Sequence, residues 1–259
     1  MNAGTNILVI DAGNTRIKLA LLEGDRLAQA FDIDTDSFRS VPLAGILTER
    51  FKQRPDAAIL ASVVRGAAEV LRDAVSEAYG IELVVARPDM PIGVSVGVPN
   101  PDGVGIDRLL TAGETFSRYK SALVVISCGT AITVDVVSAE GVYLGGTISP
   151  GLKTAAWSLS ARTSLLPEVE LQGGAISNVP DSTIPAIQVG ITVGTAGAID
   201  RLIRELALRA GIESYQVILT GGDSRRIGPI LECDHRIEDD LVLKGLGRTF
   251  SRLKGPPGG

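Results

Sequence analysis

The sequence has a single histidine, His235, and two cysteines, Cys128 and Cys233, in 259 residues. So little histidine removes most routes to a Ser-His or Cys-His nucleophile and to a histidine-based zinc site. Two cysteines fit a protein of the reducing cytosol better than a disulfide framework. Chemistry in this chain must therefore rest on carboxylates, hydroxyls, Lys and Arg side chains and backbone amides.

Long apolar runs and blocks of like charge are also missing. No apolar run approaches the roughly 18–20 residues that a membrane span needs. The net charge of −5 is spread along the chain, so neither a membrane nor a nucleic acid is expected as a partner. The first residues, MNAGTN, lack the basic region of a secretory signal. We therefore expect a cytoplasmic protein, long enough for one large domain or two of ordinary size.

One pattern of strands and helices occurs twice along the chain, and each copy begins with three strand runs. The first copy has strands at 6–12, 16–22, 26–32, 56–64 and 81–87 and helices at 43–51 and 66–79. The second has strands near 122–127, 131–138, 141–148 and 216–220 and helices at about 104–119, 151–162, 183–209 and 240–253. The repeat predicts a duplicated α/β architecture with a cleft between its halves.

A Pro- and Gly-rich loop at 88–103 separates the two copies. Such a long loop is typical of a domain boundary or an active-site segment. We therefore expect an N-terminal half at 1–103, a C-terminal half at 104–254, and a disordered tail at 255–259.

Two of the predicted hairpins share a turn. Residues 5–21, TNILVIDAGNTRIKLAL, and residues 122–137, ALVVISCGTAITVDVV, each pass from a buried strand through a Gly-containing turn into a returning strand. Asp11 in the first copy falls over Ser127 in the second. Asn and Gly are favoured in any hairpin turn, but the aligned second turn favours two tips that grip one polyphosphate.

The residues of the first turn suit a phosphate and a metal ion. Gly13 lets the backbone approach a phosphate, while Asn14, Thr15 and the exposed amides can donate hydrogen bonds to its oxygens. Asp11 would hold Mg²⁺, directly or through water, because hard cations prefer oxygen ligands. Lys18 adds positive charge nearby.

Three further motifs admit an ordinary and a functional interpretation. NPDGVGIDRLL (100–110) opens a helix with Asp107 and Arg108 in its first turn. An acidic residue there stabilises the helix through its dipole by about 0.3–1 kcal/mol, or the pair is a general base with a substrate anchor. The segment 145–167, in which Pro150 and Gly151 open a helix, fits a capped amphipathic helix or one whose Ser- and Thr-rich face lines a pocket. The glycines of LTGGD (219–223) fit an ordinary strand-to-helix turn, or let an adenine and ribose lie against the backbone.

Taken in order, five segments resemble the motifs of the type III pantothenate kinases, from about residue 6 to 253. They are DAGNT (11–15), VGIDR (104–108), SCGTAITVD (127–135), YLGGTISPG (143–151) and LTGGD (219–223). These kinases belong to the actin/Hsp70/sugar-kinase superfamily. The resemblance therefore implies a duplicated ribonuclease-H-like fold, with two βββ-αβα halves around a central cleft.

The resemblance also implies an activity and a set of site residues. It implies phosphorylation of pantothenate with ATP and Mg²⁺, the first step of coenzyme A biosynthesis, with Asp107 as general base and Asp11 at the metal. The implied ATP contacts are Asp11, Ala12, Gly13, Asn14, Thr15, Arg16, Ile17, Lys18 and Thr130. The implied pantothenate contacts are Gly105, Ile106, Asp107, Arg108 and Thr183. In this family the threonine at the place of Thr183 reaches the partner subunit's site, so a homodimer is implied.

Two positions depart from the family's pattern. Ser127 stands where the family usually has an aspartate that helps bind a monovalent cation such as K⁺ or NH₄⁺. A neutral hydroxyl is a weaker ligand than a carboxylate. A main-chain carbonyl is the other candidate for the missing oxygen, since Asp135, eight residues on and near the far end of the returning strand, is expected to be too distant. Val98 stands where a tyrosine often lies near the pantothenate site. Two alternatives to the kinase stay open: a weakened nucleotide- or metabolite-binding relative with a regulatory role, and a different small-molecule kinase of the superfamily.

Overall fold

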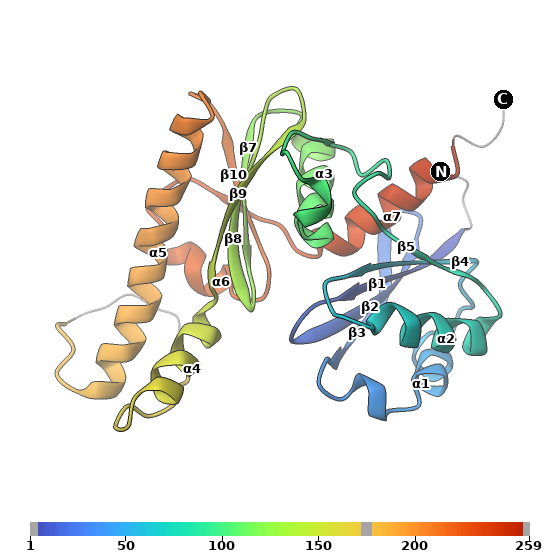
Figure 1. The fold of residues 1–259 in the computed structure, drawn as a ribbon, viewed down its shortest axis with the longest axis horizontal. Helices are drawn as coiled ribbons and strands as arrows, with labels where there is room; N and C mark the ends of the chain where they lie inside the picture. Colours follow the sequence, from blue (N-terminus) through green and yellow to red (C-terminus); the bar gives the residue numbers. More distant parts are fainter. Residues whose placement is uncertain (1–4, 172–177, 256–259) are drawn as a thin grey trace. The chain divides into compact units, whose positions relative to one another are not determined.

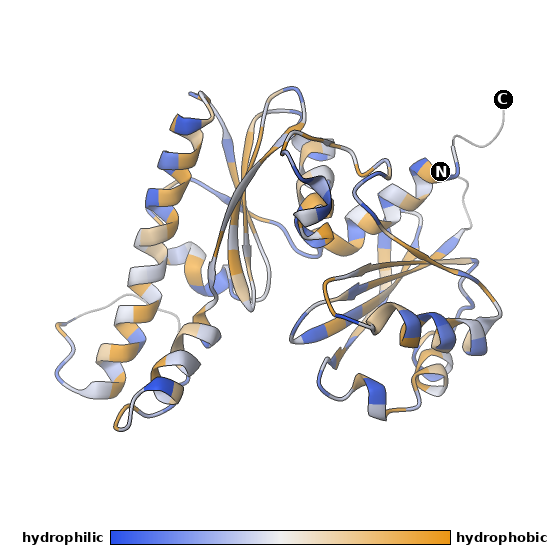
Figure 2. Ribbon diagram, in the orientation of Figure 1, coloured by the Kyte–Doolittle hydropathy of each residue, from blue (hydrophilic) through white to orange (hydrophobic). Residues whose placement is uncertain are grey.

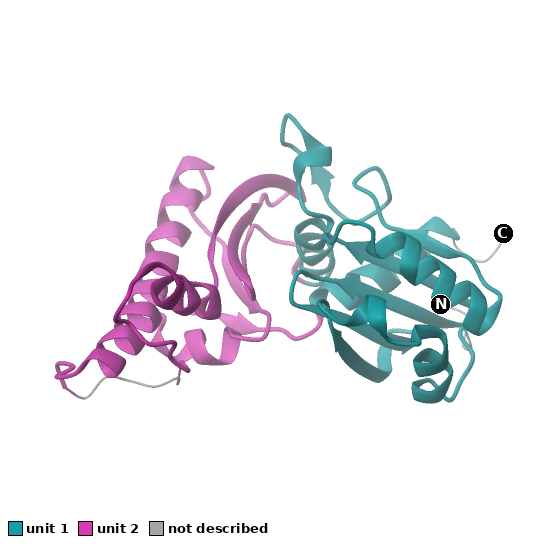
Figure 3. Cartoon of the chain, turned by 60° about the horizontal axis from the view of Figure 1, so that its bottom comes forward, with its two compact units in different colours: residues 1–118, 241–259 teal, residues 119–240 magenta. Residues whose placement is uncertain are grey.

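The computed structural model describes residues 5–171 and 178–255, which form two compact units (Figure 3). Unit 1 combines Met1–Arg118 with Leu241–Gly259, and unit 2 is Tyr119–Asp240. The boundary expected at residue 103 followed the order of elements, whereas these units follow packing. Apart from Gly255, the expected tail lies outside the described residues, as do the first four residues.

Unit 1 is built on a five-stranded sheet with the order β3-β2-β1-β4-β5 (Figure 1). Its strands are β1 (Asn6–Ala12), β2 (Arg16–Glu23), β3 (Arg26–Asp34), β4 (Ala57–Ser62) and β5 (Leu83–Val85). β1, β2 and β3 are antiparallel neighbours, while β1, β4 and β5 run parallel.

Helices cover both faces of this sheet. Leu8, Ile10 and Ala12 of β1 share one core with buried residues of α1 (Leu43–Arg50) and α2 (Ala67–Tyr79). Because side chains alternate along a strand, Val9 and Asp11 point to the opposite face. α7 (Leu241–Leu253) packs against β1 and β4, and its Gly247 lies on Leu22, which belongs to that second face. α3 (Ile106–Tyr119) lies beside α7, and the short elements are η1 (Phe38–Ser40), β6 (Ser95–Val96) and η2 (Pro101–Gly103).

The strands of unit 2 repeat this order as β9-β8-β7-β10-β11. They are β7 (Leu123–Cys128), β8 (Ala131–Val137), β9 (Val142–Pro150), β10 (Gln216–Thr220) and β11 (Arg236–Ile237). The directions also match, since β7, β8 and β9 are antiparallel and β7, β10 and β11 are parallel. The two identical orders confirm the duplicated ribonuclease-H-like α/β fold.

The helices of unit 2 are α4 (Leu152–Arg162), α5 (Thr183–Arg209), α6 (Ser224–Ile227) and η3 (Gly228–Ile230). Val124, Ile126 and Cys128 of β7 share one core with buried residues of α4 and α5. Ser127 therefore points to the opposite face. The charged residues of α5 all lie from Asp200 onward, so its N-terminal half is apolar or neutral (Figure 2).

Candidate active site

The first hairpin tip joins β1 to β2 and is held from both neighbouring strands. Gly13 N donates to Arg16 O at 3.0 Å and closes the turn. Thr35, just after β3, donates from Oγ1 to Gly13 O at 2.7 Å and from its backbone N to Thr15 O at 3.0 Å. On the β4 side, Val63 N donates to Ala12 O at 3.1 Å. Asn14, Thr15 and Arg16 stay exposed, so a fixed tip presents polar groups and amides, as the sequence predicted.

Asp11 lies at the base of this tip, opposite Lys18 in the β1–β2 register. Burial and the neighbouring Asp107 carboxylate raise the pKa of Asp11 from 3.8 to about 7, and Lys18 acts in the other direction. A repulsion of this kind requires the two carboxylates to be close. The structure thus brings together Asp11 and Asp107, which are far apart in the sequence but both belong to unit 1.

Asp107 lies in the first turn of α3, as expected. Its carboxylate folds back over Gly105, where an added Cβ would lie 2.5 Å from Asp107 Oδ1. Arg108 N donates to Gly105 O at 3.1 Å, and Thr111 Oγ1 donates to Asp107 O at 2.8 Å. A side chain at position 105 would therefore push the Asp107 carboxylate from this place, and the GIDR segment puts a carboxylate and a guanidinium at the start of one helix.

The second hairpin tip, in unit 2, joins β7 to β8 and has the same supports. Gly129 N donates to Ala131 O at 3.0 Å, which makes this turn one residue shorter than the first. Gly151 N donates to Thr130 O at 3.0 Å, and Thr154 Oγ1 donates to the same oxygen at 2.7 Å. From the other side Asp223 N donates to Cys128 O at 3.1 Å. Thr130 itself is exposed at the tip.

Two glycines, to which the sequence analysis gave no definite role, pack closely against this second tip. A Cβ on Gly151 would overlap Gly129 O, and a Cβ on Gly221 would overlap Cys128 O. Gly221 also has φ +93°, a conformation that L side chains rarely adopt. The SPG and LTGGD motifs therefore both pack on the second hairpin. For Gly221 the available signal was its position directly after the predicted strand 216–220, whereas the strand before Gly151 was predicted to end at 148 and in the structure continues to Pro150.

Ser127 faces Thr133 across the β7–β8 register. Thr133 Oγ1 donates to Asp135 Oδ2 at 2.9 Å, and Tyr143 OH donates to Asp135 Oδ1 at 2.7 Å. The buried Asp135 carboxylate is thus tied into β8 and β9. Within residues 5–171 and 178–255, no group of three or more His, Cys, Asp or Glu side chains could hold a metal ion.

The remaining site residues fall in different places. Thr183 is the exposed first residue of α5, in unit 2, whereas Asp107 and Arg108 belong to unit 1. Val98 is half-buried in the loop between β6 and η2. Ile106 is buried, and Ala12 and Ile17 are buried in the β1–β2 hairpin, so their contribution to a ligand is confined to backbone atoms.

A family model described as type III pantothenate kinase matches residues 7–205. A type III pantothenate kinase of Geobacter sulfurreducens is 32% identical over 254 residues, covering 95% of this chain and 98% of the relative. One of Syntrophotalea carbinolica is 32% identical over 260 residues, covering 96% and 100%.

One solved structure also shows the fold. An inorganic polyphosphate/ATP-glucomannokinase of Arthrobacter sp. strain KM superposes with a TM-score of 0.50 at 16% identity, covering 96% of this chain and 100% of that one. At this level of sequence identity the structural similarity supports a shared fold and nothing more. Among the described residues, no helix is long and apolar enough to cross a membrane.

Proposed function

The chain belongs to the type III pantothenate kinase family, and we propose that it transfers the γ-phosphoryl group of ATP to pantothenate. The product is 4′-phosphopantothenate, and the reaction is the first step of coenzyme A biosynthesis. The observation that carries this proposal is the meeting of Asp11, at the base of a phosphate-binding hairpin, with Asp107, at the start of α3.

Asp107 is the proposed general base. It takes the proton from the primary hydroxyl of pantothenate as that oxygen attacks the γ-phosphorus. Because phosphoryl transfer passes through a loose transition state, it needs mainly alignment and charge neutralisation. A carboxylate with no histidine partner is sufficient for such a late proton transfer. Gly105, Ile106 and Arg108 hold pantothenate beside it, Arg108 through its charge and the other two through the backbone, and Thr183 is proposed as a further contact.

The first hairpin, Asp11 to Lys18, is the proposed site of the ATP phosphates. Its fixed tip offers amides and the side chains of Asn14 and Thr15, and Lys18 and Arg16 bring positive charge. Thr130 of the second hairpin is proposed as another ATP contact. Its exposure at a tip held by Gly151 and Thr154 supports that role.

The family's kinase activity uses a divalent metal, which we propose to be Mg²⁺ held at Asp11. The donor set fits, because burial and, to a smaller extent, the neighbouring Asp107 carboxylate raise the pKa of Asp11, and a cation beside the two carboxylates would offset both effects. When bound, the ion supplies neutralising charge to the phosphate oxygens. We propose weak dependence on K⁺ or NH₄⁺, since Ser127 supplies only a hydroxyl and Asp135 already accepts two hydrogen bonds.

A homodimer is part of the proposal. α5 exposes Val193 at 36%, and Gly190, Gly194 and Gly197, which lie on the same face of the helix as Val193, have nothing within 4 Å of an added Cβ. An apolar helix face with small residues suits close packing on a second copy. Light scattering after gel filtration tests the dimer. The free thiols of Cys128 and Cys233 support a location in the reducing cytoplasm.

The test of the activity uses purified protein with ATP, Mg²⁺ and pantothenate, with and without K⁺ or NH₄⁺, and mass analysis of the product. We expect 4′-phosphopantothenate in all cases, with little stimulation by the monovalent cations. Binding of ATP without product under any cation would contradict the kinase and indicate a nucleotide-binding relative. Phosphorylation of another alcohol in preference to pantothenate would reassign the substrate.

A further inference from the structure

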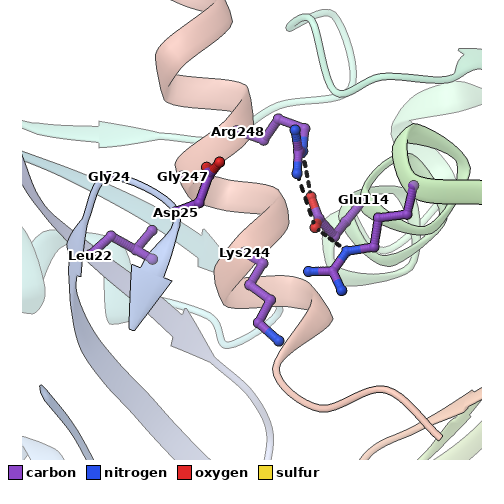
Figure 4. Close-up of a pocket in the computed structure, with 8 residues that line it drawn as sticks. Leu22, Gly24, Asp25, Glu114, Lys244, Gly247 and Arg248 are labelled. Carbon is purple, nitrogen blue, oxygen red and sulfur yellow. Dashed lines mark hydrogen bonds and ion pairs between the residues drawn. The ribbon is translucent and has the colours of Figure 1, made fainter. Parts of the chain in front are cut away.

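α3 carries a buried carboxylate in its middle that the proposed reaction does not use. The side chain of Glu114 is fully buried, with 0% exposure, in unit 1. Arg118 Nε, from the same helix, donates to Glu114 Oε1 at 2.7 Å. Arg248 of α7 donates from Nε to Oε2 at 2.7 Å and from Nη2 to Oε1 at 3.4 Å. Figure 4 shows the two guanidinium groups approaching the carboxylate from separate helices.

Burying a charge is costly unless it is paired and hydrogen-bonded, and breaking such a pair leaves an uncompensated buried charge. Here the two arginines remain about one-third exposed, at 32% and 34%, along a hollow of about 270 Å³ that Asp25 and Lys244 also line. The guanidinium groups thus remain in contact with solvent, whereas the Glu114 carboxylate is buried away from it. The contact with Arg248 uses both carboxylate oxygens, which fixes direction as well as distance.

Glu114 stands on the same face of α3 as Asp107. Seven residues make almost two whole turns, so the Cα atoms of the two residues lie about 10.5 Å apart along the helix axis and almost in line. The Glu114–Arg248 pair joins α3 to α7, which packs against β1, and β1 carries Asp11. A chain of contacts therefore runs from the helix of the proposed base to the strand of the proposed metal ligand.

The packing of α3 on its neighbours is close. An added Cβ on Gly245 of α7 would lie 2.7 Å from Leu110 O, and one on Gly113 would overlap Ile92 O. Arg252 adds a second polar link, from Nη2 to Ser117 Oγ at 2.7 Å and from Nη1 to Ile92 O at 2.8 Å. Apolar and backbone contacts between helices tolerate small sliding movements. A two-point ion pair opposes them, since sliding breaks one of its hydrogen bonds.

We propose that Arg248, acting through Glu114, is a positioning residue that sets the place of Asp107 along the axis of α3. This inference rests on the proposed role of Asp107 as base. A displacement of about 1 Å at a reacting group costs up to about 100-fold in rate, so a small slide of α3 is enough to lower turnover.

Arg118 provides the matched control. Both arginines pair with the same carboxylate at the same Nε distance and with similar exposure, but the Arg118–Glu114 pair lies within α3, whereas the Arg248–Glu114 pair joins α3 to α7. Arg248→Met should lower kcat about tenfold or more, with KM for ATP within about twofold, because the hairpin tip is untouched. Arg118→Met should leave kcat within about twofold of wild type. Arg248→Lys keeps the positive charge but not the two-point hydrogen bonding of the guanidinium group, so its kcat should lie between those of the two methionine variants.

Two further measurements separate positioning from mere stability, all at a temperature where every variant is folded by circular dichroism. Glu114→Gln combined with Arg248→Met should have the kcat of the poorer single variant, since both act through one contact. Hydrogen exchange in a peptide covering residues 105–112 should be faster in Arg248→Met than in wild type and unchanged in Arg118→Met.

Equal losses of kcat in the two arginine variants, or equal exchange at the start of α3, would overturn the positioning role. A wild-type protein that forms no 4′-phosphopantothenate would instead refute the proposed function. In that case the exchange comparison still decides whether Arg248 fixes the start of α3.

Discussion

The two hairpin tips are held by equivalent groups but carry different side chains. In the first, the residues that follow β3 and β4, Thr35 and Val63, donate backbone hydrogen bonds to the turn. In the second, Gly151 and Asp223 do the same after β9 and β10. Yet the facing pair at the base of the turn is Asp11 with Lys18 in one case and Ser127 with Thr133 in the other.

This comparison separates what the fold repeats from what the chemistry needs. The backbone support of a turn recurs because it follows from the strand order, which is the same in both units. The charge at the facing pair does not recur: the first tip has a carboxylate, a lysine and the nearby Asp107, while the second has two hydroxyls and close-packed glycines, and its neighbouring Asp135 is tied into β8 and β9. We infer that unit 1 supplies the metal site and the base, and that unit 2 supplies neutral contacts.

The largest expected effect comes from removing the proposed base, Asp107. Asp107→Asn should lower kcat by about 10²–10⁴-fold, because the amide cannot accept the proton of the attacking hydroxyl. Steady-state kinetics with pantothenate measure this. Asp102→Asn, at an exposed carboxylate of η2 just before α3, is the matched control and should change kcat little. Near-normal turnover of Asp107→Asn would mean that Asp107 only positions substrate or stabilises its helix.

The next largest effect comes from replacing Asp11, which should lower activity but raise stability. Asp11→Asn should lower kcat/KM for Mg·ATP about 10–100-fold through loss of a metal ligand. The folded-state pKa of about 7 lies above the ordinary 3.8, so ionised Asp11 destabilises the apo protein above pH 7 and costs nothing below about pH 4. The variant should therefore melt at a higher temperature than wild type at pH 8, and the gain should shrink as pH falls from 7 to 4.

Thermal melts without Mg²⁺ and nucleotide test this, with Ser127→Ala as the control at the second tip. That control removes no charge, so its melting difference from wild type should not vary with pH over this range. A pH-independent gain in Asp11→Asn would refute the raised pKa of Asp11, to which burial contributes most and Asp107 less. Unchanged ATP kinetics would refute the metal role.

The sequence predicted the hairpins well because their alternation and turn residues are local signals. Asp11, Gly13 and Thr130 therefore appeared where expected. It could not show β11, whose two residues are too few for a periodic pattern. It also could not show that α3 and α7 pack with unit 1, which depends on contacts between distant segments. Glu114 was missed for the same reason, since only the arrival of Arg248 makes its burial tolerable.

A smaller effect tests how tightly the second tip is packed. Gly151→Ala should destabilise unit 2 by about 1–3 kcal/mol, because its Cβ would overlap Gly129 O in a backbone that has little room to move. Trp157, the only tryptophan, lies on α4 and reports urea unfolding of this unit by fluorescence. Gly222→Ala, in the same unit and with nothing within 4 Å of an added Cβ, should change stability little. Equal midpoints for the two variants would contradict the close contact at the tip.

The smallest expected effect comes from making the second tip resemble the first. Ser127→Asp places a carboxylate opposite Thr133 and diagonal to the buried Asp135 on the same face of β7 and β8. The two like charges should repel, so the new group favours a nearby cation. We expect turnover to gain a two- to fivefold stimulation by K⁺, about 0.4–1 kcal/mol at the transition state, whereas wild type responds little. Ser127→Asn introduces a side chain of the size of aspartate without its charge, and its turnover should show no stimulation by K⁺. If wild type already depends on K⁺, the cation must be held by oxygens other than a carboxylate at position 127. The difference in charge between the two tips would then not determine cation binding.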